Sequence, residues 1–372
     1  MMLKRLFWVG VLVGLSSWLT VIAPARAADL FVIRDVPVDV TAKTAARARV
    51  LAHAQGRAEA FRRLIERLTL EEDREKLPEL GDETLAEIVS DFGVDNEKTS
   101  RVRYLAKLNV RFKADEIRRL FRDHGVRIAE TVSKPILMLP IFEAGGGMRL
   151  WEEDNTWRNA WNLRRAHRGL VELALPLGDL SDRAALDAAQ ASSGDVQRLT
   201  ALSSRYSAGD SVVALAQVGR VSGTSFRRLD ISTTRYSSHS DPVADQLVLT
   251  QKDGESLEGL LVRAADQVAA NLEEAWKREN LLNSTIKGIT AVTVPIGGLK
   301  DWLKVKGSLE KVSLVRRLEV ILMSLDEIRI NLHYVGAPEQ LQIALGQADL
   351  ALIREEDEWV LYPVGGVPPG KS

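Results

Sequence analysis

The residues best suited to chemistry lie in "RLWEEDNTWRNAWN", residues 149–162, where three of the eight tryptophans of the chain fall within eleven positions around a run of acids. Tryptophan rings pack well on flat apolar faces such as those of sugars, and carboxylates and amides hydrogen-bond to polar ligands. Trp151, which we expect in a loop, is the strongest single candidate for ligand contact. The candidate binding residues are Gly145, Gly146, Gly147, Trp151, Glu152, Glu153, Asp154, Asn155 and Trp157.

A structural role competes with this binding role. Trp157 and Trp161 are four residues apart, so on a helix they share one face, and Asn155 or Thr156 can cap that helix. The acids stabilise the positive end of the helix and disfavour an anionic ligand there. We therefore expect Trp157 and Trp161 to pack the helix onto a sheet, with the glycine loop just beyond the carboxyl end of a buried strand, where open α/β sheets bind ligands.

Catalytic signatures are missing from the sequence. The five histidines are scattered, and no zinc-protease, nucleophile-elbow, phosphate-loop or calcium-loop motif is present. His333 alternates outward on its strand and is expected to be solvated. Adjacent acids in one loop rarely provide the two carboxyl groups across a cleft that glycoside hydrolysis requires. The sequence thus assigns no catalytic residue, metal or cofactor, and a hydrolase would need a cleft joining Glu153 or Asp154 to His167 or another acid.

The N-terminus, "MMLKRLFWVGVLVGLSSWLTVIAPARAAD", has the form of a secretory signal. Lys4 and Arg5 precede an uncharged run over 6–22, and Ala25-Arg26-Ala27 supplies the small residues that a signal peptidase reads. An uncleaved anchor is the alternative, although 17 apolar positions interrupted by two serines are at the lower edge of a span. These features predict a signal peptide over 1–27, a mature chain from Ala28 and a periplasmic location. No later segment is long and apolar enough to cross a membrane.

Charge and cysteine content narrow the function classes. Cleavage removes three of the 50 basic residues and none of the 51 acidic ones, so the mature net charge is −4, which argues against nucleic acid as a partner. The chain has no cysteine, which excludes disulfides, thiol chemistry and a lipidated cysteine. Burial alone must hold the fold, and 45% hydrophobic residues are enough for two or three domains.

The first unit, 28–132, is expected to be a small α+β domain. A strand at "VPVDV" precedes a long helix over 43–68, and an alternating strand over 101–112 precedes a shorter helix closed by Gly125. In the long helix small residues recur every four positions, and Gly56 among them predicts close approach to a sheet. The arginines of the second strand could hold an anionic polymer, but we favour pairing with Asp35 and Asp39 across the sheet.

The central unit, 133–283, is expected to be an α/β domain with a mixed sheet. The apolar run "ILMLPIF" indicates a strand buried on both faces, and the glycine loop and the tryptophan helix follow it. A strand at "GLVELALPL", a helix ended by Gly209 and three successive strands come next. A long helix over 255–281 closes the unit and is expected to pack on its own sheet.

The third unit, 284–364, has the order β-α-β-β-α-β of a ferredoxin-like module. Its second helix has Pro338 near the first turn, where the missing N–H costs nothing. "LALIREEDEWVLYPV" forms the last strand segment, and 365–372 is expected to be a disordered tail. The predicted fold class is therefore α+β, in three small modules.

Two stretches carry a resemblance to a known family: "KPILMLPIFEAGGGMRLWEEDNTWRNAW", and "DWLKVKGSLEKV" together with "YVGAPEQLQIALGQADLAL". The chain resembles the exported proteobacterial family called domain of unknown function 2066, over nearly the whole mature sequence. The resemblance implies export and implies no activity or site residue. More remotely, the first unit resembles small modules of periplasmic flagellar and envelope assembly proteins. The central unit is similar to the α/β amino-terminal domains of envelope assembly factors such as the Tol–Pal translocation protein, and a similar layout does not fix function.

Together these features predict a soluble periplasmic protein of a Gram-negative bacterium that works by binding. We expect a scaffold or accessory factor in envelope assembly or maintenance, with envelope proteins or peptidoglycan as partners. A glycan or peptidoglycan binder that uses Trp151 and the acidic loop is the first alternative, and an unrecognised envelope hydrolase is the second.

Overall fold

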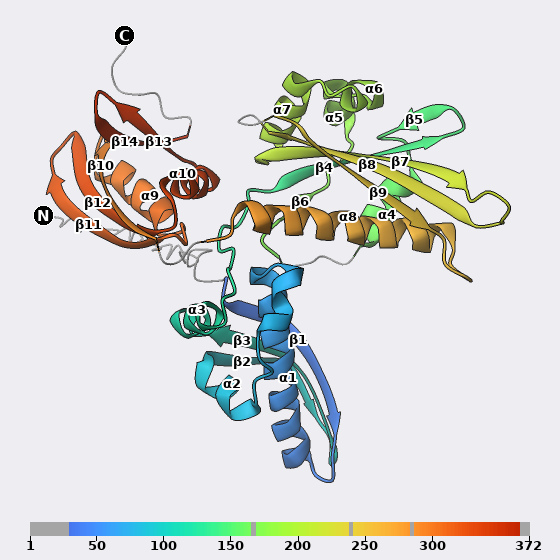
Figure 1. Cartoon of the computed structure of the whole chain (residues 1–372), viewed down its shortest axis with the longest axis horizontal. Helices are drawn as coiled ribbons and strands as arrows, with labels where there is room; N and C mark the ends of the chain where they lie inside the picture. Colours follow the sequence, from blue (N-terminus) through green and yellow to red (C-terminus); the bar gives the residue numbers. More distant parts are fainter. Residues whose placement is uncertain (1–29, 165–168, 238–240, 283–285, 365–372) are drawn as a thin grey trace, which may run out of the picture.

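The structure, a computed structural model, describes residues 30–164, 169–237, 241–282 and 286–364. The expected signal peptide and the expected tail lie outside these ranges. The described chain is a mixed α+β protein with three sheets, one in each expected unit (Figure 1). None of the helices in these ranges is long and apolar enough to span a bilayer.

The N-terminal unit is a three-stranded antiparallel sheet in the order β1-β3-β2, with α1 lying along one face (Figure 1). The predicted strands and helices are present. The strand β2 and the short helices η2 and α2 are additions that the sequence reading missed. The elements are β1 (Val32–Thr41), α1 (Ala45–Leu68), η2 (Glu71–Lys76), α2 (Asp82–Ile88), β2 (Val89–Thr99), β3 (Arg103–Phe112) and α3 (Ala114–Asp123).

The small-residue stripe of α1 does bring the helix close to the sheet. Ala48, Ala52 and Ala60 are buried, and Gly56 lies between them on the same face. A Cβ on Gly56 would sit 2.2 Å from Cδ1 of the fully buried Leu108. A larger residue at this helix position would therefore displace the buried side chain of Leu108, and the close approach that glycine allows compensates its lower helix propensity.

The charged face of the same sheet is paired. Arg103 donates two hydrogen bonds to Asp39 on the neighbouring strand, at 2.7 and 2.6 Å. These bonds and the charge of Arg103 hold the pKa of Asp39 below its usual value. Cross-strand pairing, which the sequence favoured over an anion-binding face, is confirmed at this position.

The central unit has a mixed sheet in the order β5-β4-β7-β8-β9, with the two-residue β6 also paired to β4. β4 and β7 are parallel, whereas β7, β8 and β9 form an antiparallel meander. The second strand predicted at "GLVELALPL" is only two residues long, Leu173–Ala174, and the residues on either side of it lie in loops. The elements are β4 (Ile136–Ala144), β5 (Gly147–Arg149), α4 (Thr156–Leu163), β6 (Leu173–Ala174), α5 (Leu180–Ala185), α6 (Ala188–Ser192), α7 (Val196–Arg205), β7 (Asp210–Arg220), β8 (Arg227–Ser237), β9 (Val243–Thr250) and α8 (Leu257–Glu279).

Helices cover both faces of this sheet (Figure 1). The helices α4 and α8 pack on one face, where Met138 and Val212 lie in the core, and α8 does pack on its own sheet as expected. The helices α5, α6 and α7 cover the other face, around Leu137 and Leu139. Alternate residues of β4 therefore belong to two cores, which confirms that this strand is buried on both faces.

The C-terminal unit is a five-stranded sheet in the order β11-β12-β10-β14-β13, with α9 and α10 packed on it. The first four elements follow the expected strand-helix-strand-strand order, and β12 lies antiparallel between β10 and β11. The elements are β10 (Lys287–Pro295), α9 (Leu299–Leu309), β11 (Val315–Met323), β12 (Glu327–Val335), α10 (Pro338–Gln347), β13 (Leu350–Glu355) and β14 (Glu358–Pro363).

The last segment of this unit differs from the expected single strand. Glu356 adopts φ 52°, and the turn at 356–357 folds the segment into the hairpin β13–β14. β14 inserts beside β10 in parallel and moves β13 to the edge. Each residue of β13 thus lies opposite a residue of β14, and β14 has a strand on both sides.

Candidate binding site at the junction of the three units

The tryptophan helix is part of the core. Trp157 and Trp161 are buried, and their rings meet edge to face with centroids 5.5 Å apart. The indole Nε1 of Trp157 donates to the carbonyl oxygen of Ala214 on β7 at 3.0 Å. The expectation that Trp157 and Trp161 brace the helix against the sheet is confirmed, and Trp157 is removed as a binding candidate.

Trp151 lies in a loop, as expected, but its burial argues against the expected contact with a ligand. Trp151 is only 8% exposed and lies on the opposite face of the sheet, in the core under α5 to α7. Its Nε1 donates to the carbonyl oxygen of Leu186 at 2.7 Å, and the guanidinium of Arg158 lies 5.6 Å from its ring centroid. A loop position did not imply exposure here, because the loop crosses the edge of the sheet and turns its indole inward.

The polar residues around Trp151 shape the loop. Asn155 is fully buried, caps α4 by accepting from the backbone N–H of Arg158, and donates to backbone carbonyls of this loop and of β4. The carboxylate of Glu152 accepts two backbone N–H groups, and Asp154 pairs with Arg149 at 2.8 Å. Glu153 is exposed. Asn155, Glu152 and Asp154 therefore use their polar groups on the protein itself.

The glycine loop closes a hairpin. Gly145 and Gly146 have φ of 62° and 82°, and the chain returns at Gly147 as β5, antiparallel to β4. All three glycines are exposed. The loop does not lead directly from the strand into a helix, so the expected ligand position at the carboxyl end of β4 is not formed by these glycines.

The histidines do not assemble a site in the part of the chain that the structure describes. His53 contacts the hydroxyl of Tyr104 at 3.3 Å, and burial, with nearby arginines, lowers the pKa of His53. His124 contacts a backbone carbonyl, and His333, half-buried rather than fully solvated, contacts Glu319 at 3.1 Å. His167 lies outside the described residues. No group of three histidine or acidic residues in the described ranges could hold a metal ion.

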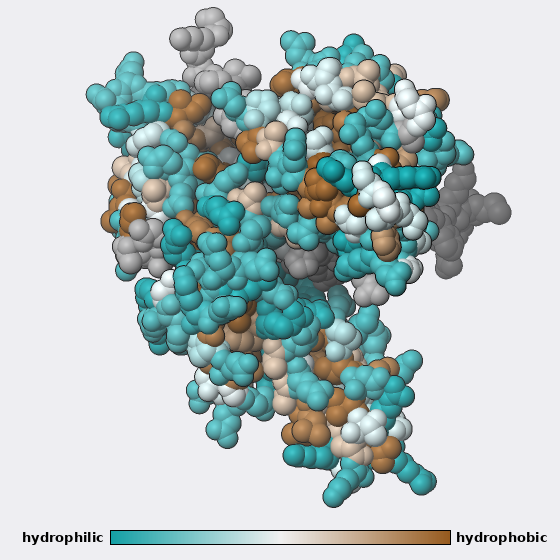
Figure 2. Space-filling view, turned by 45° about the vertical axis from the view of Figure 1, so that its right-hand side comes forward, coloured by the Kyte–Doolittle hydropathy of each residue, from teal (hydrophilic) through white to brown (hydrophobic). Residues whose placement is uncertain are grey.

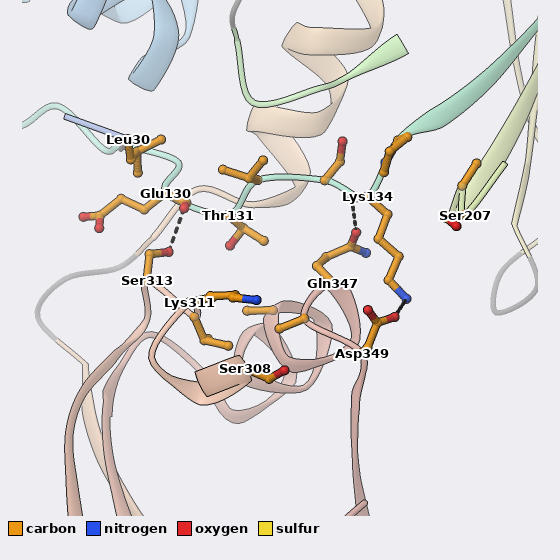
Figure 3. Close-up of a pocket in the computed structure, with 17 residues that line it drawn as sticks. Leu30, Glu130, Thr131, Lys134, Ser207, Ser308, Lys311, Ser313, Gln347 and Asp349 are labelled. Atoms are coloured by element: carbon orange, nitrogen blue, oxygen red, sulfur yellow. Dashed lines mark hydrogen bonds and ion pairs between the residues drawn. The ribbon is translucent and has the colours of Figure 1, made fainter. Parts of the chain in front are cut away.

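A cavity of about 730 Å³ lies where the three units meet, and we call it the junction cavity (Figure 3). One wall is the linker 130–135, which connects the first two units, and the other wall comes from the ends of α9 and α10 in the C-terminal unit. Much of its lining is polar. The polar lining residues include Thr131, Lys134, Ser207, Ser308, Lys311, Ser313, Gln347 and Asp349.

Direct contacts fix the distance between the two walls. The backbone N–H of Lys134 donates to Oε1 of Gln347 at 2.5 Å, and the Lys134 ammonium pairs with Asp349 at 2.6 Å. Across the cavity, the hydroxyl of Ser313 donates to the carbonyl oxygen of Glu130 at 2.6 Å (Figure 3). Lys311 lies between these contacts, is exposed, and has no carboxylate partner within the described ranges. The cavity thus offers one uncompensated positive charge among hydroxyl and amide groups.

The linker is held in place by a buried carboxylate. Glu130 is 2% exposed and accepts two hydrogen bonds from Arg118 of α3, at 2.8 and 2.7 Å, while Arg316 of β11 lies 3.5 Å away. Burial by itself lowers the pKa of Arg118, but the bonds and charge of Glu130 and Asp115 outweigh it and raise that pKa above its ordinary value. One carboxylate therefore ties together the N-terminal unit, the linker and the C-terminal unit.

A buried lysine joins α8 to the N-terminal unit. Lys277 is 2% exposed, and its ammonium donates to the carbonyl oxygens of Glu66 and Thr69 at 2.8 and 2.9 Å, at the C-terminal end of α1. A cation is favoured at this end of a helix. Burial lowers the pKa of Lys277, and the nearby Glu274 opposes that shift.

The sequence patterns do not predict the junction cavity or the two buried charged residues beside it, Glu130 and Lys277. Glu130 lies in a linker and Lys277 in the last turn of a helix. The hydrogen bonds of Glu130 to Arg118 and of Lys277 to Glu66 span 12 and 211 residues. The one available signal was the polar linker "ETVSKP" between two apolar stretches, which contains an acid. Comparisons with protein-family models, with curated proteins and with solved structures found no match for this chain.

Proposed function

We propose that this chain is an exported, non-enzymatic binding factor that serves as a scaffold or accessory protein in the bacterial cell envelope, and that a partner binds at the junction cavity. The proposal includes a periplasmic location after cleavage before Ala28, membership of the domain of unknown function 2066 family, and a ferredoxin-like module in the C-terminal unit. Its support is the leader, the two quoted stretches and the strand order β11-β12-β10.

The single observation that carries the binding proposal is the composite character of the junction cavity. Its walls come from all three units, and an ion pair and hydrogen bonds between the walls fix their separation. A cavity of this volume is in the range of ligand and side-chain sites, and Lys311 supplies a charge that favours a carboxylate or another anionic group on the partner. The glycan-binding alternative loses its main residue, because Trp151 is buried.

Site-specific cross-linking tests this proposal. A photo-cross-linking amino acid is placed at Lys311 and, as a matched control, at Lys252, which is an exposed lysine in the turn between β9 and α8. In living cells we expect adducts with an envelope component from position 311 and none of the same mass from position 252. A Lys311→Glu charge reversal should weaken binding of the identified component, and Lys252→Glu should not. Identical adducts from both positions, or none from position 311, would contradict the proposal.

Location is tested separately. Mass spectrometry of the protein from a periplasmic fraction should find a chain that begins at Ala28. A chain that keeps residues 1–27 and stays with the membrane or the cytoplasm would reject export as proposed.

A further inference from the structure

A pocket lined by four arginines lies between the N-terminal and C-terminal units, and we call it the arginine pocket. Its volume is about 170 Å³. The charged residues in its lining are Arg118, Arg122, Arg127, Arg316 and Glu130. Arg316 belongs to β11, and the other arginines belong to α3 and the segment that follows it. The lining therefore carries four positive charges and one negative charge.

Arg118 already takes up the one negative charge of the lining. Its Nε and Nη2 donate to the two carboxylate oxygens of Glu130, whose side chain is 1% exposed. Two further acids lie near the arginines: Asp115 pairs with Arg118, and Asp123 lies 3.9 Å from Arg122. The side chains of these acids are 92% and 59% exposed, so water screens their charges and the pairs contribute little. Within the described residues, the pocket thus keeps an excess of positive charge.

Two arginines of the pocket keep donor groups without a protein acceptor. Only Nη2 of Arg316 approaches a carboxylate, at 3.5 Å from the oxygens of Glu130, where a hydrogen bond is weak. Burial, with the charge of Arg118, lowers the pKa of Arg316 against the opposing charge of Glu130. Arg127 is exposed, and its side chain has no hydrogen bond or ion pair within the described residues. An anion in the pocket would supply the acceptors that these guanidinium groups lack.

Most of the remaining lining is apolar. Phe121, Val126, Ile128 and Leu282 contribute to it, and each of them is at most 5% exposed. Charges beside such a surface interact more strongly than charges in open water. A volume of about 170 Å³ is below the roughly 300–1,000 Å³ of sites that enclose a whole ligand. The pocket therefore fits a small ion or one charged group of a larger molecule.

The arginine pocket is distinct from the junction cavity. Glu130 lines both of them, but its side chain points away from Lys134 and Gln347 (Figure 3). The two sites therefore lie on different sides of the linker, and Lys311 of the junction cavity does not line the arginine pocket.

We propose that the arginine pocket binds a phosphate group, which Arg122, Arg127 and Arg316 hold. Guanidinium groups bind phosphate oxygens through paired N–H donors. A phosphate group with one ester bond or none carries about −1.5 to −2 charges at pH 7, so it compensates the positive excess more fully than a carboxylate does. Since its ligands come from α3, from the segment after α3 and from β11, the bound phosphate links the N-terminal and C-terminal units. This inference goes beyond the binding function proposed for the junction cavity and does not depend on it.

Two probes separate a free phosphate from a lipid headgroup. The full mature chain is titrated with inorganic phosphate in a calorimeter, and it is floated with vesicles of phosphatidylcholine, with and without phosphatidic acid, at pH 7 and constant ionic strength. Saturable binding of inorganic phosphate assigns the pocket to a free ion or a small phosphorylated molecule. Flotation that requires phosphatidic acid, without binding of the free ion, assigns it to a headgroup. If neither probe binds, the proposal is overturned.

Substitutions test whether the arginine pocket is the site of that binding. Arg127→Gln should raise the dissociation constant of the binding probe at least about tenfold, because a charge-assisted contact is lost, while urea unfolding without phosphate stays as in the wild type. Arg316→Lys keeps the charge but loses the planar pair of donors, and it should also weaken binding. The matched control is Arg47→Gln, at an exposed arginine in the first turn of α1 outside the pocket, and it should bind like the wild type. Binding that Arg127→Gln and Arg316→Lys leave unchanged, or that Arg47→Gln weakens equally, would overturn the proposal.

Discussion

Removing the charge of Glu130 is the sharpest test of how the three units are joined. The side chain of Glu130 is 1% exposed, and those of its partners Arg118 and Arg316 are 20% and 30% exposed. The Glu130→Gln variant keeps the shape of the side chain but removes the buried carboxylate that two partly buried guanidinium groups share, and leaves Arg118 only the exposed carboxylate of Asp115. The mutual repulsion of the two guanidinium groups then acts directly on the contact between α3 and β11.

The expected magnitude follows from burial. Breaking a buried ion pair by removing one partner costs about 3–5 kcal/mol, because a buried charge is left uncompensated. Since both arginines reach solvent in part, we expect the lower end, about 3 kcal/mol of unfolding free energy. Asp115→Asn is the matched control: Asp115 also binds Arg118, at 3.0 Å, but is 92% exposed, so its loss should cost at most about 0.5 kcal/mol.

Urea unfolding at pH 7, followed by tryptophan fluorescence and by circular dichroism, measures both variants. Trp276 is one of the six tryptophans that follow residue 27, and it contributes to the signal from beside the linker, because its indole Nε1 donates to the carbonyl oxygen of Thr131 at 2.7 Å. In Glu130→Gln the fluorescence transition should move to lower urea than in Asp115→Asn. If the two variants unfold within about 0.5 kcal/mol of each other, the claim that Glu130 ties the units together is refuted.

Three further predictions concern single elements. Gly56→Ala should lower the unfolding free energy by about 1–2 kcal/mol in thermal or urea melts, because overpacking against the sheet outweighs the gain in helix propensity. The control is Gly346→Ala, whose Cβ would meet nothing within 4 Å and which should stabilise the fold by up to about 1 kcal/mol. Equal effects of the two substitutions would refute the close approach of α1 to the sheet at Gly56. Trp151→Phe should destabilise by about 1–3 kcal/mol through a lost buried hydrogen bond, and a neutral result in the same melts would mean that this indole is not structurally required. Two hydrogen bonds from Arg263 lower the pKa of Glu255 from 4.5 to about 2. This pair therefore stabilises the fold above pH 4.5 and loses its effect as the pH falls toward 2. The unfolding free energy of Glu255→Gln should fall less steeply over this pH range than that of the wild type, and an unchanged pH profile would contradict the pairing of Glu255 with Arg263.

Periodicity in the sequence was sufficient to predict most helices and strands and one close contact between a helix and a sheet. The alternation in β3 placed its buried face, and the spacing of small residues around Gly56 anticipated the approach of α1 to Leu108. The four-residue spacing of Trp157 and Trp161 predicted a shared buried face. These features are local, so the repeat of a helix or a strand is enough to read them.

Only the tertiary structure decided where the loops turn and which distant residues meet. Trp151 is buried because its loop folds over the sheet edge, and the final segment forms two strands because a turn at Glu356 pairs it with itself. The junction cavity exists because Glu130 and Lys134 meet residues of the C-terminal unit. Such contacts depend on how complete units pack against each other, and hydrophobic periodicity within one segment carries no information about that packing.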